Sequence, residues 1–179
     1  MPFPKSNEAK DSICPFFFDL KQRKSRQQPS CEYSWITAYS TRPFDDQNHL
    51  RVRLETEAKL YIQARIKQGD LQLVWSYILE FENVQNPFQA RKHTIARWKN
   101  LASALILESN GLLAIAHELL AKGIKPKDAL HVASAIKGEA DCFLSTDDKL
   151  LKKLVNISQI RVMNPVNFIG AVDEYDYRY

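Results

Sequence analysis

Hydrophobic residues recur every three to four positions through much of the chain, which predicts a series of amphipathic helices. The predicted helices are one from Leu50 to Ile66, one opened by Ser76 and interrupted at Asn86-Pro87, one through Ile95, Trp98, Leu101 and Ala102, one from Leu112 to Leu120, one opened by Pro126, and a short one over 147–154. In the first helix, Asp45 or Asp46 can serve as the N-cap and Gly69 can end the helix. Its predicted apolar stripe is Leu50, Leu54, Ala58, Tyr61 or Ile62, and Ile66.

Short apolar runs between these helices predict strands. The predicted strands are Leu71 to Trp75, Cys142 to Leu144, and Ile160 to Met163. Strands that alternate with helices are typical of parallel sheets with helical crossovers. The pattern therefore predicts an α/β fold.

The first thirty residues differ from the rest. They contain four prolines and the basic run 21–26, and they show no helical or alternating period. Such a segment is expected to be disordered. The basic run could contact nucleic acid, although a short run of this kind is more typical of a solvated tail.

Composition narrows the function classes. A chain of 179 residues with 45% hydrophobic residues and a mean hydropathy of −0.37 suits one packed domain and contains no apolar stretch long enough for a membrane span. The net charge of +4 is compatible with a phosphate-bearing partner. The three cysteines are odd in number and lack metal-type spacing, which favours a reducing compartment and a cytoplasmic protein.

Asp147 follows the predicted strand 142–144 closely, and ligands gather at the carboxyl ends of strands in such sheets. A structural explanation is also available. Ser145 and Asp148 could form a capping box, with Asp147 as a first-turn acid favoured by the helix dipole. Asp128, just inside a predicted helix, and Glu82, on another helix, have similar structural explanations.

Taken together, the residues around these acids resemble a known family. The stretches that carry the resemblance are 127–136 (KDALHVASAI), 141–151 (DCFLSTDDKLL), 162–165 (VMNP), 42–47 (RPFDDQ) and 75–83 (WSYILEFEN). They resemble PIN domains, metal-dependent ribonucleases that include the VapC-type toxins of toxin–antitoxin pairs. The resemblance covers about residues 42–169.

The resemblance implies a three-layer α/β/α fold with a central parallel sheet. It also implies a cluster of acids that holds Mg²⁺ or Mn²⁺, hard cations that prefer oxygen ligands. Glu82, Asp128 and Asp147 would be both the catalytic and the metal-binding acids, with Asp148 as the alternative if the register shifts by one residue. His131, one turn from Asp128, is expected to pack or to form a hydrogen bond, with metal ligation as the less favoured alternative. The implied partners are RNA and a cognate antitoxin protein, and the implied assembly is a homodimer.

The sequence departs from the family at its first acid. PIN domains open with an apolar strand that ends in an aspartate, which should fall here at Ile36, and the segment 31–41 lacks a carboxylate within the four residues expected for it. Trp35 is encoded by TGG and an isoleucine codon begins with AT, so reading from the last base of each codon gives GAT, an aspartate, across this junction. The codons before it encode apolar residues in the same frame. We therefore hypothesise that a surplus base near Thr41 shifts the frame.

These inferences divide the chain into an atypical segment over 1–41, disordered or out of frame, a PIN-like domain over 42–169 and a C-terminal tail over 170–179. They leave two function classes. One is an endoribonuclease that is impaired because its first acid is absent. The other is a non-catalytic PIN-like module that binds RNA or a protein.

Overall fold

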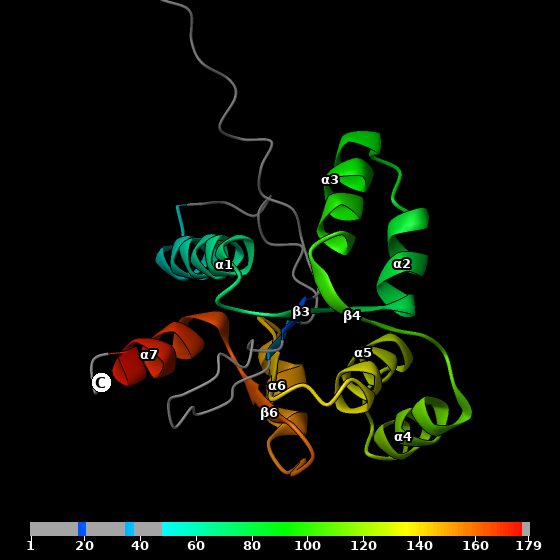
Figure 1. The fold of residues 1–179 in the computed structure, drawn as a ribbon. Coiled ribbons are helices and arrows are strands. Elements are labelled where there is room, and N and C mark those ends of the chain that lie inside the picture. Colours follow the sequence, from blue (N-terminus) through cyan, green and yellow to red (C-terminus); the bar gives the residue numbers. More distant parts are fainter. Residues whose placement is uncertain (1–17, 21–34, 38–47, 177–179) are drawn as a thin grey trace, which may run out of the picture.

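The structure is a computed structural model that describes residues 18–20, 35–37 and 48–176, with side chains described over 48–172. Its strands are β1 (Phe18–Leu20), β2 (Trp35–Thr37), β3 (Leu73–Ser76), β4 (Ala102–Ile106), β5 (Cys142–Leu144) and β6 (Arg161–Met163). Its helices are α1 (Leu50–Gln68), α2 (Tyr77–Val84), α3 (Gln89–Lys99), α4 (Asn110–Ala121), α5 (Pro126–Lys137), α6 (Asp148–Leu154) and α7 (Pro165–Asp176). The fold is mixed α/β, as predicted (Figure 1).

The described strands form one sheet in the order β4-β3-β1-β2-β5-β6. Three neighbouring pairs are parallel, namely β3 with β4, β2 with β5, and β5 with β6. The exception is β1, which is antiparallel to both of its neighbours, β2 and β3. The prediction of parallel strands is thus confirmed for these three pairs.

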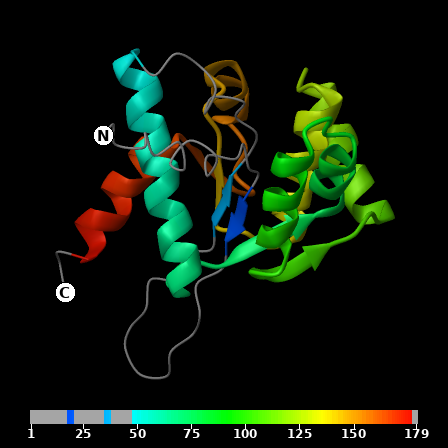
Figure 2. The same ribbon diagram turned by 90° about the horizontal axis from the view of Figure 1, so that it is seen from above.

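Apart from α6, the described helices gather in two groups. Figures 1 and 2 show α1 and α7 together on one side of the strands and α2, α3, α4 and α5 together on the other. The core between them is apolar, and Phe143, Leu73, Leu112 and Val132 are each 0% exposed. Small residues on α5, such as Ala129 and Ala133, let this helix approach the strands closely because they lack bulky side chains.

Most limits of the predicted elements agree with the structure, but the strands β1, β2 and β4 and the helix α7 were not predicted. Helix α3 ends at Lys99, and Ala102–Ile106 form β4 rather than the end of that helix. β4 pairs in parallel with β3, and Ser103 Oγ donates to the carbonyl of Leu73 over 3.0 Å. Pairing with β3 therefore overrides the helical preference of an alanine- and leucine-rich segment.

The apolar stripe of α1 also differs from the prediction at its N-terminal end. Leu50 and Leu54 are 62% and 48% exposed, whereas Glu55 is buried. The N-cap is His49, and Asp45 and Asp46 lie outside the described residues. Gly69 ends the helix as predicted, with a φ of 85° that favours glycine.

The predicted N-terminal segment over 1–41 and the predicted tail over 170–179 can both be compared with the structure. Within 1–41, residues 18–20 and 35–37 are strands in the middle of the sheet, and the division of the chain into three segments stays a prediction. The basic run 21–26 lies outside the described residues. At the other end, α7 passes through position 169 and continues to Asp176.

Candidate functional site

Glu82 lies on α2, which begins where β3 ends. The Ser76 hydroxyl caps this helix by accepting a hydrogen bond from the Leu79 amide. The Glu82 carboxylate then reaches α5, with Oε2 3.3 Å from His131 Nε2 and Oε1 3.2 Å from Lys127 Nζ. Because a carboxylate can only accept, His131 Nε2 donates to Glu82. The expectation of a hydrogen bond from His131 is confirmed.

The pKa values of this pair follow from their surroundings. Burial raises the pKa of Glu82, but the hydrogen bond to His131 and the charges of His131 and Lys127 outweigh burial and lower the pKa overall. His131 is 3% exposed, and burial lowers the pKa of its imidazole. The contacts with His131 and Lys127 therefore favour the ionised form of Glu82, while burial favours the neutral form of His131.

Asp128 lies in the first turn of α5, after Pro126, and is half-buried. Burial raises its pKa, and the charges of Asp147 and Glu82 raise it further, while Lys125 and Lys153 oppose the shift. Asp128 therefore lies within electrostatic range of both Glu82 and Asp147, which come from separate parts of the chain.

Asp147 is exposed and is the N-cap of α6. Its Oδ1 accepts from the backbone amides of Lys149, over 2.8 Å, and Leu150, over 3.2 Å. The predicted capping box is therefore wrong, because Asp147, and not Ser145, caps the helix. The Ser145 hydroxyl instead accepts from the Asp147 amide over 3.1 Å and fixes the turn between β5 and α6.

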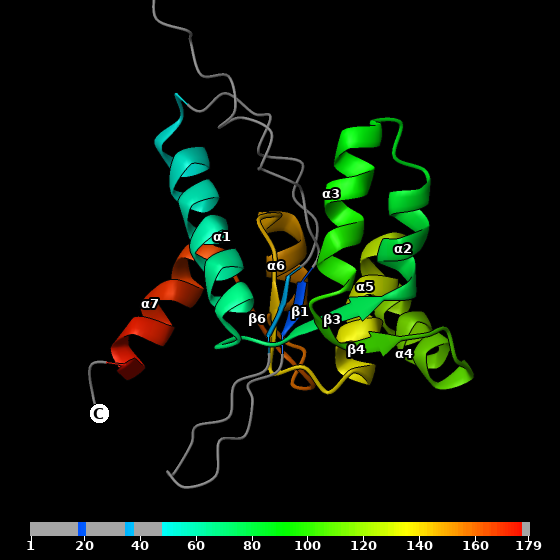
Figure 3. The ribbon, with the colours of Figure 1, turned by 45° about the horizontal axis from the view of Figure 1, so that its top comes forward.

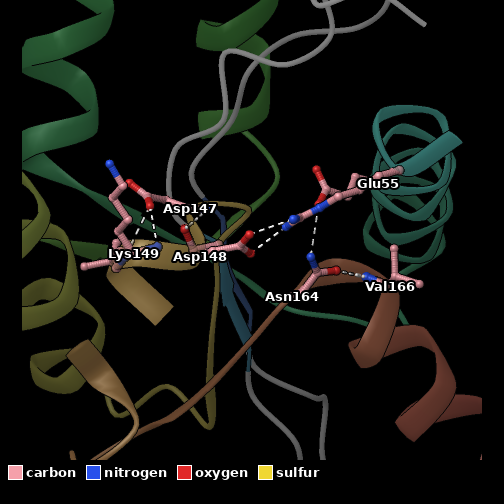
Figure 4. A network of polar contacts seen from close by, with 9 residues as sticks. Glu55, Asp147, Asp148, Lys149, Asn164 and Val166 are labelled. Atoms are coloured by element: carbon pink, nitrogen blue, oxygen red, sulfur yellow. Dashed lines mark hydrogen bonds and ion pairs between the residues drawn. The ribbon is translucent and has the colours of Figure 1, made fainter. Parts of the chain in front are cut away.

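Asp148 points away from Asp147 and toward α1 (Figure 4). Its two carboxylate oxygens accept from Arg51 Nη1 over 2.6 Å and Nη2 over 2.5 Å. Asp148 is not among the groups that shift the pKa of Asp128. The geometry thus favours Asp147 over Asp148 as the acid that accompanies Asp128.

The Arg51 network contains residues that the sequence did not single out. Arg51 Nε also donates to Glu55 Oε1 over 2.7 Å, and Asn164 Nδ2 donates to the same oxygen over 3.2 Å (Figure 4). Glu55 is 1% exposed. A carboxylate on the buried side of α1, one turn after an arginine, is the sequence signal that could have indicated this network.

The Arg51 network borders an open pocket of about 610 Å³ between α1, α6, β6 and α7. Aliphatic side chains form most of its lining, and they include the exposed Leu50 and Leu54. The position of these two leucines on the pocket accounts for their exposure.

Position 36, where the family's first acid is expected, lies in β2. Its partner in the parallel pair is Phe143 of β5, and Asp147 lies shortly after the end of β5. Since the carboxyl ends of parallel strands lie at the same edge of a sheet, position 36 is close to the edge from which Asp147 extends.

The donor types of the three acids suit a hard divalent cation, because carboxylate oxygens are its preferred ligands. The positions of these carboxylates are less favourable for binding a cation than their chemical type. In the part of the chain that the structure describes, no group of three or more His, Cys, Asp or Glu side chains is placed to hold a metal ion. Glu82 contacts Lys127 and His131, and Asp147 Oδ1 contacts the amides of α6.

Comparison of the sequence with models of known protein families gives no match, and comparison with curated proteins gives none either. Since neither comparison gives a match, the class of site follows from the residues and their geometry.

No helix of the described residues is long and apolar enough to cross a membrane.

Proposed function

We propose that this chain is a PIN-like relative of Mg²⁺- or Mn²⁺-dependent endoribonucleases whose activity is impaired because the first acid is absent. One observation carries the proposal. Glu82 of α2 contacts Lys127 and His131 of α5, the helix that carries Asp128, and the charges of Glu82 and Asp147 both act on Asp128. Paired and clustered carboxylates with shifted pKa values are typical of functional sites.

The arrangement of the sheet supports the finer fold assignment. Helices lie on both sides of the strands, and β5 is parallel to both of its neighbours. This is what a three-layer α/β/α fold with a central parallel sheet requires. The antiparallel β1 is the part that this fold class does not account for.

Glu82, Asp128 and Asp147 would hold the cation in the proposed site. When bound, a divalent cation supplies a nucleophilic water at neutral pH and neutralises charge on the scissile phosphate. The chain's own residues prepare for this role in different ways. The contacts with Lys127 and His131 favour the ionised form of Glu82, whereas burial and the neighbouring carboxylates disfavour the ionised form of Asp128, which is the form that would bind a cation.

The absent first acid is the reason to expect impairment. A missing metal-binding carboxylate weakens metal affinity and misplaces the attacking water, and small displacements of this kind cost orders of magnitude in rate. The chain is therefore expected to cleave RNA weakly or not at all. A variant whose residues 32–41 follow the alternative frame, including Ile36→Asp, is expected to cleave in a metal-dependent manner.

The test compares both chains on 5′-labelled RNA with Mn²⁺ and with EDTA. The restored variant with Asp128→Asn is the matched control and should be inactive. Strong Mn²⁺-dependent cleavage by the original chain would contradict the role assigned to the first acid. Cleavage by the restored variant that survives Asp128→Asn would contradict the site.

The second candidate function is a non-catalytic module that binds RNA or a protein, such as a cognate antitoxin, as a monomer or a homodimer. The absence of a metal-holding group among the described residues favours it. Calorimetric titration with Mn²⁺ separates the two candidates. Binding that Asp128→Asn abolishes supports the nuclease-type site, whereas no measurable binding supports the binding module.

A further inference from the structure

Helix α3 is strongly basic. It carries Arg91, Lys92, Arg97 and Lys99 and contains no acidic residue. α3 packs beside α2, the helix that carries Glu82 (Figure 3). A basic helix therefore lies next to the candidate acidic site.

The two lysines of α3 face α2. Lys92 Nζ donates to the carbonyl of Val84 over 3.0 Å, and Lys99 Nζ lies 2.9 Å from Glu80 Oε2. His93 and Arg97, which are one turn apart, are exposed instead. This exposed face presents a guanidinium that is well placed to contact a phosphate.

An aromatic ring marks the start of α3. Phe88 is the N-cap of the helix, and its side chain is 56% exposed. The guanidinium carbon of Arg91 lies 4.3 Å from the centre of the Phe88 ring. Exposed rings beside arginine are the features on which unpaired bases stack in proteins that bind single strands.

Further cations lie on α5, which also packs against α2, at the N-cap of α5 and on α6. Lys127 contacts Glu82, and Lys125 and Lys153 act electrostatically on Asp128. Basic side chains thus lie both on α3 and next to the candidate acids. This distribution of charge complements a polyphosphate backbone that passes over α3 and reaches the acids.

We propose that α3, together with Phe88, is a docking surface for single-stranded RNA. Arg97 contacts a phosphate of the RNA and Phe88 stacks on a base. The choice of RNA over DNA, and the path toward Glu82, rest on the proposed function. The binding surface itself rests on the charges and the exposed ring of α3.

The test is fluorescence anisotropy of a 5′-fluorescein-labelled oligouridine RNA with the full chain, in EDTA, over a series of KCl concentrations. Arg97→Glu is compared with Arg53→Glu, which changes the same residue type at an exposed position on α1. Both variants have the same net charge, so a difference between them reports position. Circular dichroism checks that each variant is folded.

Arg97→Glu is expected to weaken binding about tenfold at low salt and to reduce the salt slope by about 0.7, the value for one lost contact to a single strand. Phe88→Ala should weaken binding about fivefold or more and leave the slope unchanged. Arg53→Glu should change the affinity less than about twofold. Equal losses for Arg97→Glu and Arg53→Glu, or no RNA binding by the original chain, would overturn the proposal.

A DNA strand of matching sequence and a Mn²⁺ titration complete the design. Equal affinity for DNA would overturn the choice of RNA. If the original chain binds RNA but not Mn²⁺, the result counts against the metal site and in favour of the RNA-binding surface. Mn²⁺ binding without RNA binding would do the reverse, so the two proposals fail separately.

Discussion

Asp147 has two roles that substitutions can separate, since its carboxylate caps α6 and its charge acts on Asp128. Asp147→Ala removes the oxygen that accepts from the amides of Lys149 and Leu150. Loss of an N-cap costs about 1 kcal/mol, within a range of about 0.5–2. For a chain of this size, a loss of about 1 kcal/mol lowers Tm by about 2–4 °C.

Asp147→Asn keeps an acceptor oxygen at the cap but removes the charge. Its Tm should therefore stay close to that of the original chain, because asparagine is among the best N-caps. Both variants remove a negative neighbour of Asp128, so the pKa of Asp128 should fall in both. Both should also lose affinity for Mn²⁺ under the proposed function.

The assays are thermal unfolding by circular dichroism and NMR titration of the Asp128 side-chain carboxyl carbon. Asp148→Asn is the matched control. It weakens the pair with Arg51 but should leave the pKa of Asp128 unchanged. If Asp147→Asn lowered Tm as much as Asp147→Ala, the capping role would be wrong. An unchanged Asp128 pKa in both Asp147 variants would refute the convergence of the three acids.

Four further predictions test the fold and its charges. Phe143→Ala removes a ring that is 0% exposed and should lower the free energy of unfolding by about 3–5 kcal/mol in urea titration; a loss under about 1 kcal/mol would contradict its place in the core. Gly69→Ala should cost about 1 kcal/mol because φ is 85°, whereas Gly170→Ala, in α7 with open space around it, should stabilise by about 0.5–1 kcal/mol; equal effects would count against the left-handed cap. The lowered pKa of His131 means that the unfolded chain takes up a proton first, so stability should fall as the pH drops below about 6.5, and His131→Gln should flatten this profile; an unaltered profile would count against a buried neutral imidazole. Asp128→Asn should raise Tm at pH 7 because it removes a half-buried carboxylate that Asp147 and Glu82 repel, and a lower Tm would contradict this account.

Local signals were sufficient for most of the fold. The cap at Ser76, the proline at the start of α5 and the glycine at the end of α1 each mark an element limit that neighbouring residues determine. β4 could not be recognised in this way. Its composition suits a helix, and its strand conformation depends on pairing with β3, which is distant in the chain.

The candidate site also contains some residues that the sequence could indicate and others that it could not. Glu82, Asp128 and Asp147 were selected through the resemblance of the stretches around them to PIN domains, since each acid taken alone also had a structural explanation. The Arg51 network could not be selected in this way, since it joins Arg51 to Asp148, 97 residues away, and Glu55 to Asn164, 109 residues away. Hydrogen bonds over such separations leave no periodic signal in the chain.

The antiparallel β1 has a practical consequence for work with fragments. It is the only described strand that bonds to both β2 and β3, so it joins β4 and β3 on one side to β2, β5 and β6 on the other. A fragment that began at residue 42 would lack both β1 and β2, and its sheet would be divided into two separate pairs of strands. The chain expressed for binding and cleavage experiments should therefore include residues 18–37. If the N-terminus is shortened, the first residue kept should lie before Phe18.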